Sequence, residues 1–176
     1  MQVQAENSEA IKRKYPEPVI LITVKDIKGK YNITPCSWAM TASRDPLMFA
    51  FSLAVKRFTL ESIRKKGEFV VAYPSTVMAD EVLYYGTNSG RDVDKLSDRP
   101  LEYKAAETVD SIILDKCTAN FECVLDSEHI AGDHVIVTAK VVKSWVNSDK
   151  SLSRLFNVAS GFKLQGVQTG LDIDIF

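Results

Sequence analysis

Three stretches of the sequence carry cationic, polar and aromatic side chains at spacings that could hold a phosphate-bearing heteroaromatic ligand. The first is Asn32–Trp38 (NITPCSW), the second runs from Ser52 to Thr59, and the third is Asn88–Lys95 (NSGRDVDK). A phosphate needs cationic donors, a hydroxyl and the free N–H groups of a helix N-terminus. Arg57, together with Thr59 in a predicted helix that opens at residues 58–60, offers all three.

The flat part of such a ligand needs hydrogen bonds at its polar edge and an apolar or aromatic surface against its face. The first stretch supplies both kinds of group through Asn32, Thr34, Cys36, Ser37 and Trp38. Each signal also has a structural interpretation. A Lys-Arg pair such as 56–57 is typical of a solvated surface, and a tryptophan is typical of a core. Spacing alone leaves both interpretations open.

A second group, Glu128, His129, Asp133 and His134, has the residue types of a metal site. A polar turn with solvated side chains is the favoured interpretation, because odd spacing on a strand puts the two imidazoles on opposite faces unless a turn intervenes.

A nucleophilic pair of Cys36 or Cys123 with His134 is a further hypothesis. Cys123 alternates with apolar positions, which favours a structural role for its thiol. The sequence contains no GxGxxG, GxxxxGK[ST], HExxH or GxSxG pattern, so the Rossmann, P-loop, zincin and hydrolase signatures are excluded.

Length and composition predict one globular domain over residues 1–176. The net charge of −1 argues against a general nucleic-acid binder. Three irregularly spaced cysteines favour a reducing compartment. The first 15 residues lack an apolar signal-peptide core, and the run 19–24 is far shorter than the roughly 20 residues that cross a bilayer. We therefore expect a soluble cytoplasmic protein without a membrane partner.

Hydrophobic periodicity predicts the elements that position these residues. Strands are predicted over 18–24, 31–41, 47–53, 68–73, 117–125 and 135–142, and helices over 6–15, 58–66 and 75–85, the last with Ser75 as its cap. A loop is predicted over 86–98, a hairpin connection over 126–132, a helical turn over 152–156 and an extended tail over 163–176.

The strand over 47–53 places large residues on one face and Met48, Ala50 and Ser52 on the other, which leaves room for something to approach. Strands dominate both ends of the chain and helices the middle. This order favours a closed antiparallel barrel with helical insertions over a parallel βαβ sheet.

From about Pro16 to Gly170, the chain resembles the flavin-reductase-like, FMN-binding split-barrel family, and within it the flavoredoxin-like branch. The matching stretches are PEPVILITVKDIKGKYNITPCSWAMTASRDPLMFAFSL, KRFTLESIRKKGEFVVAYP, GTNSGRDVDKL and FECVLDSEHIAGDHVIVTAKVV. Their order and spacing carry the match. The resemblance implies a mainly β fold with α insertions, an antiparallel split barrel of Greek-key type with a few short helices.

The resemblance also implies a noncovalently bound FMN near the interface of a homodimer. The side chains that would line the flavin ring and ribityl chain are Asn32, Thr34, Cys36, Ser37 and Trp38. Those that would hold the phosphate side are Ser52, Arg57 and Thr59, with Lys95 approaching the flavin or its phosphate. His134 would be the catalytic residue, near the ring where NADH or NADPH delivers hydride.

The function implied is a flavin reductase or a flavoredoxin-type electron carrier with a separate electron-acceptor protein. The alternative is a non-catalytic ligand-binding barrel that kept the fold.

Overall fold

Strands are the predominant secondary structure of this computed structural model, which describes residues 1–166. The helices and 3-10 turns are α1 (Asn7–Ala10), η1 (Ile11–Arg13), α2 (Phe58–Lys66), η2 (Thr76–Met78), α3 (Ala79–Thr87) and α4 (Lys95–Asp98). The strands are β1 (Glu17–Pro18), β2 (Ile20–Lys25), β3 (Tyr31–Cys36), β4 (Ala39–Arg44), β5 (Leu47–Ala54), β6 (Glu68–Pro74), β7 (Tyr103–Ala105), β8 (Ile112–Leu114), β9 (Cys117–Ala131), β10 (His134–Val146), β11 (Leu155–Ala159) and β12 (Lys163–Gly166).

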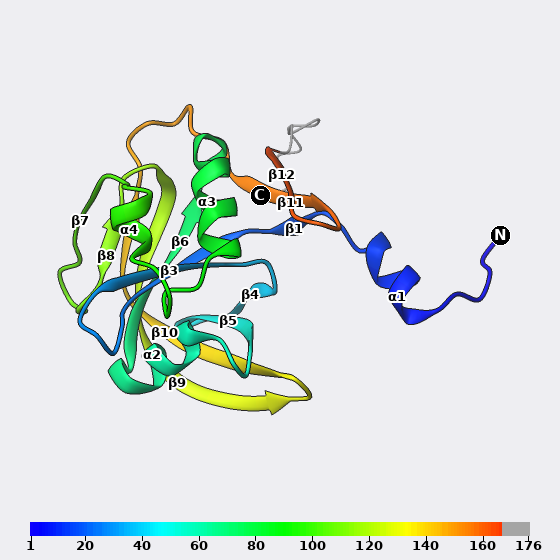
Figure 1. Cartoon of the computed structure of the whole chain (residues 1–176), viewed down its shortest axis with the longest axis horizontal. Coiled ribbons are helices and arrows are strands. Elements are labelled where there is room, and N and C mark those ends of the chain that lie inside the picture. The colour runs from blue at the N-terminus through cyan, green and yellow to red at the C-terminus, as the bar shows by residue number, and fades with distance from the viewer. Residues whose placement is uncertain (167–176) are drawn as a thin grey trace.

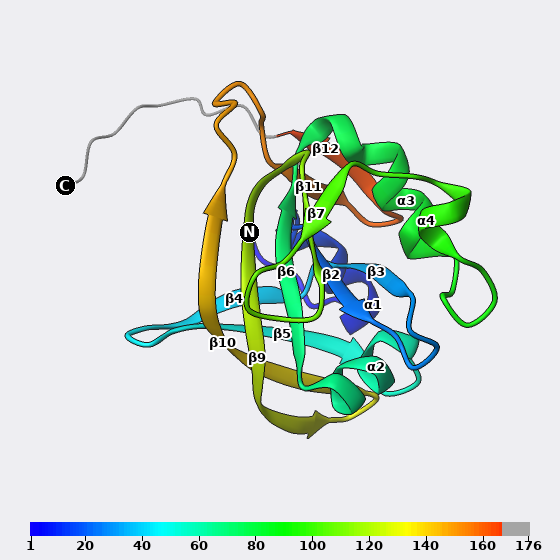
Figure 2. The same cartoon turned by 90° about the vertical axis from the view of Figure 1, so that its left-hand side faces the viewer.

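The main sheet is antiparallel, follows the order β3-β2-β6-β9-β10-β5-β4, and curls round so that β4 and β5 cross near its other strands (Figures 1 and 2). The neighbours β2–β6 and β5–β10 are distant in sequence, as Greek-key connections require. Curling leaves short edges, which limits the unpaired backbone that an open sheet would expose. The mainly β, antiparallel barrel with few short helices is therefore confirmed.

Alternating apolar residues fill the barrel. On β5, Phe49, Phe51 and Leu53 are all at most 5% exposed and pack against residues of β6 and β10. Helix α2 closes one end of this core through Leu60 and Ile63. The predicted inward face of β5 is therefore confirmed, and it directs Ser52 and Ala54 to the other side of the strand.

A second core lies on the outer face of the sheet, beneath α3 (Figure 1). Helix α3 contributes Val82 and Tyr85, and close packing brings Gly86 against β3. A Cβ at Gly86 would lie 3.0 Å from Cγ of Pro35, so this position favours glycine by contact. The helix is thus held tightly beside the C-terminal end of β3.

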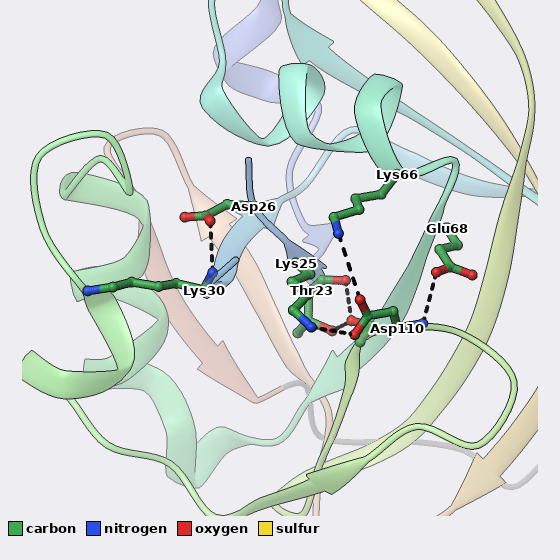
Figure 3. A network of polar contacts seen from close by, with 8 residues as sticks. Thr23, Lys25, Asp26, Lys30, Lys66, Glu68 and Asp110 are labelled. Carbon is green, nitrogen blue, oxygen red and sulfur yellow. Dashed lines mark hydrogen bonds and ion pairs between the residues drawn. The ribbon is translucent and has the colours of Figure 1, made fainter. Parts of the chain in front are cut away.

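The loop before β8 is fastened to the sheet by a polar network (Figure 3). Asp110 lies 3.0 Å from Nζ of Lys25 and 3.7 Å from Nζ of Lys66, and its backbone N–H donates to Glu68 at 3.1 Å. The next residue, Ser111, donates to the carbonyl of Thr23 at 2.8 Å. These contacts hold the segment between β7 and β8 against the sheet.

A separate three-stranded sheet, β1-β11-β12, joins the two ends of the described chain and packs against the main sheet, where Leu155 shares the second core. In its register, Glu17 pairs with Asn157, and Asn157 with Leu164. The segment before it, containing α1, projects from the body with all its residues up to Lys14 exposed (Figure 1). In the described part of the chain, no helix has the length and apolar character needed to span a membrane.

Several predicted boundaries are wrong. The strand predicted over 31–41 is two strands, β3 and β4, at opposite ends of the sheet order. The chain bends at Ser37-Trp38, where the carbonyl of Trp38 accepts from the N–H of Ser52 at 2.9 Å, and β4 then pairs with β5. Residues 152–156 form no helical turn, because β11 begins at Leu155 and pairs with β1 and β12.

Predictions of a helix cap, a loop and a hairpin connection in the middle of the chain are also wrong in part. Ser75 does not cap the predicted helix; its hydroxyl donates to the carbonyl of Lys116 at 2.5 Å. The predicted loop over 86–98 begins inside α3 and ends with α4, whose first turn is capped by Asp94. The connection predicted over 126–132 is mostly strand, since β9 runs to Ala131. The extended tail predicted over 163–176 is consistent with the structure over 163–166, which form β12, and 167–176 lie outside the described residues.

Candidate functional site

A cavity of about 310 Å³ opens where the end of the barrel, helix α3 and the small sheet meet. Its volume falls at the lower end of the range for small-ligand pockets. The bend between β3 and β4 contributes Cys36, Ser37 and Trp38, and β5 contributes Ser52. The structure therefore brings together residues from the first two stretches identified in the sequence.

Strand register explains why β5 and β10 face this cavity together. Ala54 lies directly opposite His134, and Ser52 opposite Ile136, so Ser52, Ala54 and His134 share one side of the sheet. Ser52 and Ala54 have small side chains, so this side of β5 leaves open space for the cavity. The large side chains of β5 lie on its other side, in the core.

Two aromatic rings stack at the cavity wall. The ring centroids of Trp38 and His134 are 4.7 Å apart, with planes inclined by 37°. The Nδ1 atom of His134 lies 2.7 Å from Oδ1 of Asp133, a hydrogen bond that lowers the pKa of that carboxyl. When Nδ1 carries the proton toward Asp133, Nε2 is left as the atom able to accept or pass a proton.

Arg57 supplies the cationic group of the cavity and stands at the start of α2. Among residues 1–166, no carboxylate lies within ion-pair distance of its guanidinium. Its extended backbone leads into the first turn of α2, where the opening N–H groups have no partner within the helix. A cation beside a helix N-terminus is suited to an anionic group such as phosphate.

Cys36 lines the cavity as a neutral thiol. Burial raises its pKa to about 11, and its Sγ lies 3.4 Å from the carbonyl oxygen of Ser52 and 3.7 Å from that of Trp38. Burial likewise raises the pKa of Cys123 to about 12. A thiolate is the nucleophilic form of cysteine, so neither environment supports the Cys–His nucleophile hypothesis.

The remaining predicted site residues do not line this cavity. Asn32, Thr34 and Thr59 form a buried cluster in which Nδ2 of Asn32 donates to Oγ1 of Thr59 at 2.9 Å and the two threonine hydroxyls bond each other. Oδ1 of Asn32 has no hydrogen-bond partner within residues 1–166. Their role in binding a cofactor stays a prediction.

Lys95 is also buried, at 3% exposure, and is the first residue of α4. Its Nζ donates to the carbonyls of Ile33 and Tyr85, each at 2.7 Å. Burial, followed by the nearby charge of Arg57, lowers its pKa to about 8. Lys95 is thus held by carbonyls of β3 and α3, close enough to Arg57 for the two charges to interact. The contact of Lys95 with a ligand stays a prediction.

The residues of the metal hypothesis are dispersed. Glu128 pairs with Arg64 at 2.8 Å, Asp133 with His134, and His129 lies opposite Ile136 in the β9–β10 ladder. Over the described range, no group of three or more His, Cys, Asp or Glu side chains is arranged to hold a metal ion.

Sequence reasoning missed the part of the cavity wall that comes from the chain ends. Tyr15 and Glu17 enter it from the segment around β1, Asn157 from β11, and Phe162 from the turn before β12. Phe162 adopts a left-handed backbone with φ of 59°, which is uncommon for a bulky side chain. No local pattern marks these residues, because only the pairing of β1 with β11 brings them together.

The chain is similar in sequence to the proteins of a known family. The sequence profile described as flavin reductase like domain matches residues 12–163. The chain belongs to this family. An uncharacterized protein of Pyrococcus abyssi is 30% identical over 134 residues, which are 76% of each chain.

Solved structures share the fold of this flavin reductase like domain. The flavoredoxin from Methanosarcina acetivorans superposes with a TM-score of 0.87 at 21% identity, covering 99% of this chain and 96% of the other. The FMN-binding protein from Thermus thermophilus, with bound p-hydroxybenzaldehyde, gives 0.85 at 24% identity, covering 98% and 99%. The split-barrel architecture expected from the sequence is therefore confirmed.

The residues of the cavity fit FMN by their chemistry. The guanidinium of Arg57, which has no ion-pair partner among residues 1–166, suits the phosphate, and the Ser52 hydroxyl suits a ribityl chain. Stacked Trp38 and His134, with apolar neighbours such as Val82 and Leu83, suit a flat heteroaromatic ring.

Proposed function

We propose that this protein binds FMN in the cavity and acts as an FMN-dependent oxidoreductase, a flavin reductase or a flavoredoxin-type electron carrier. One observation carries the proposal: a single cavity of this flavin reductase like domain is lined by Arg57 and by the stacked rings of Trp38 and His134. Arg57 has no ion-pair partner in the described part of the chain. The names of two structural neighbours, an FMN-binding protein and a flavoredoxin, support it.

When bound, FMN supplies the hydride and electron-transfer chemistry that protein side chains lack. Arg57 would neutralise the phosphate, and the hydroxyl of Ser52 would donate to the ribityl side. Backbone N–H groups at 36–38 would bind the polar edge of the ring, and Trp38 would shield it from water. Cys36 stays a neutral thiol there, because its pKa is raised to about 11.

His134 would contact the nicotinamide reductant. Its hydrogen bond to Asp133 and its stacking on Trp38 fix the ring orientation. An imidazole oriented in this way can hold a nicotinamide or relay a proton at Nε2. We propose NADH or NADPH as the hydride donor, a homodimer as the working form, and a separate protein as an electron acceptor.

The proposal is tested by titrating the purified full-length protein with FMN and with riboflavin, followed by flavin fluorescence. The wild type should bind FMN more tightly than riboflavin because Arg57 contacts the phosphate. Charge-assisted hydrogen bonds contribute about 1.5–3 kcal/mol, so Arg57→Met should weaken FMN binding by about tenfold to a hundredfold and leave riboflavin unchanged.

Lys56→Met is the matched control, since Lys56 is an exposed neighbour that does not line the cavity. Anaerobic addition of NADH or NADPH to the FMN complex should then bleach the flavin absorbance. A protein that takes up FMN but is never reduced would be the non-catalytic barrel, and one that takes up no FMN would contradict the whole proposal.

A further inference from the structure

One wall of the cavity, formed by the small sheet, carries two buried polar side chains that the proposed FMN contacts leave unused. Glu17 of β1 and Asn157 of β11 both line the cavity and are 9% and 4% exposed. They face each other in the antiparallel register of β1 and β11. Side chains directly opposite in such a pair have Cβ atoms about 5 Å apart, so the two groups form one polar surface.

The carboxamide of Asn157 is buried in the wall of the cavity. In the described structure its Oδ1 has no hydrogen-bond partner. Leaving a buried polar atom without a partner costs stability, and a valine or leucine at this strand position would avoid that loss. The neighbouring inward residue of the same strand is Leu155, which is buried as expected. An asparagine at 157 is therefore explained by something that enters the cavity and bonds it.

Glu17 narrows the chemistry of that ligand. One of its oxygens pairs with Nζ of Lys14, which also lies 5.4 Å from the ring of Trp38. The wall thus presents a carboxylate beside a carboxamide, a surface rich in acceptors that calls for N–H donors. A carboxamide has a C=O that accepts and an NH₂ that donates. It can therefore bond both the N–H and the C=O of a ligand amide or imide, whichever way the oxygen and nitrogen of the carboxamide are placed.

We infer that Asn157, beside Glu17, recognises an amide or imide N–H of the ligand held in this cavity and so acts as a specificity-determining residue. The inference rests on the proposed function, which offers two sources of this group. One is the imide edge of the flavin ring, and the other is the carboxamide of a nicotinamide donor. Both present an N–H beside a carbonyl, and the experiment separates them.

The test compares ligands that differ in this N–H. In the flavin arm, the probes are FMN and FMN methylated at N3. In the nicotinamide arm, the FMN-loaded protein is titrated by calorimetry with NAD⁺ or NADP⁺ and with the analogues in which an acetyl group replaces the carboxamide. The proteins are wild type, Asn157→Leu, and Asn157→Ala, which removes the same groups without added bulk should the leucine variant fail to fold.

Val158→Leu is the matched control, because Val158 lies on the same strand and does not line the cavity. In one arm, the wild type should prefer the N–H ligand by about fivefold to tenfold, the usual effect of one neutral hydrogen bond. Both Asn157 variants should lose that preference, and Val158→Leu should keep it. The arm that responds identifies the source of the amide.

The inference is overturned if the wild type shows no preference in either arm, or if the Asn157 variants keep the wild-type ratio. Tight FMN binding with an unchanged ratio would remove only this inference and leave the proposed function standing. Absence of FMN binding by the wild type would overturn the proposed function, and this inference with it.

Discussion

Replacing the buried Lys95 with methionine should change how the stability of the protein depends on pH. The side chain is 3% exposed, and burial lowers its pKa from 10.5 to about 8. Its Nζ donates to two carbonyls, those of Ile33 and Tyr85. A neutral amine has two N–H groups and can make both bonds, so the third proton of the charged form is the one that lacks a partner.

The expected magnitude follows from the difference between the two pKa values. The unfolded chain holds the proton with a pKa near 10.5 and the folded chain with a pKa of about 8, which corresponds to about 3 kcal/mol. Hydrogen bonds to carbonyls favour the charged amine, so this figure is an upper limit. Below pH 8 the full penalty is present, and it disappears as the pH rises to about 10.5, where the unfolded chain also loses the proton.

Urea denaturation at a series of pH values from about 7 to about 11 would measure the effect. Relative to Lys95→Met, the wild type should gain up to about 3 kcal/mol in free energy of unfolding over this range. Groups that titrate in both proteins, such as Tyr85, whose pKa burial raises, cancel in the difference. Lys65→Met, at an exposed site of α2, should show no such trend. A wild-type minus Lys95→Met difference that stays constant with pH would refute the reasoning.

Two further substitutions test hydrogen bonding and packing away from the cavity. Glu122 is fully buried and accepts from the backbone N–H groups of Glu107 and Thr108 and from Nε1 of Trp145. Glu122→Gln replaces one acceptor oxygen by an NH₂ donor that faces these donors. The free energy of unfolding, measured by urea denaturation, should fall by about 2–4 kcal/mol. A loss under about 0.5 kcal/mol would contradict that hydrogen-bond arrangement. Gly90→Ala would place a Cβ 2.3 Å from Oδ1 of Asn32, and should lower stability by about 1–3 kcal/mol by the same assay. An unchanged free energy of unfolding would contradict this, because it would show that the Asn32 side chain can move aside at no cost in stability.

Much of the barrel could be predicted from local pattern. Alternation on 47–53 identified the inward residues of β5, and an apolar run identified β2, because a strand buried on both faces needs apolar residues throughout. The break between β3 and β4 could not be predicted. Ser37 and Trp38 continue a strand-like sequence, and the bend depends on pairing with Ser52 on another strand.

The site divides in the same way. Local motifs identified Cys36–Trp38, Ser52 and Arg57, whose side chains do line one cavity. The contribution of Glu17 and Asn157 depends on strands from the two ends of the chain, which no local pattern brings together. The burial of Lys95 also escaped prediction, because a charged residue in a polar stretch is typical of a solvated loop.

The most direct test of the account is to load the purified protein with FMN and to titrate it anaerobically, with NADH and separately with NADPH, while the flavin absorbance is followed. The account predicts a flavin spectrum that survives removal of free FMN and then bleaches stoichiometrically with one or both nicotinamides. Arg57→Met should retain less FMN, and Lys56→Met should match the wild type. A wild-type protein that retains no flavin after incubation with FMN would contradict the assignment of this cavity.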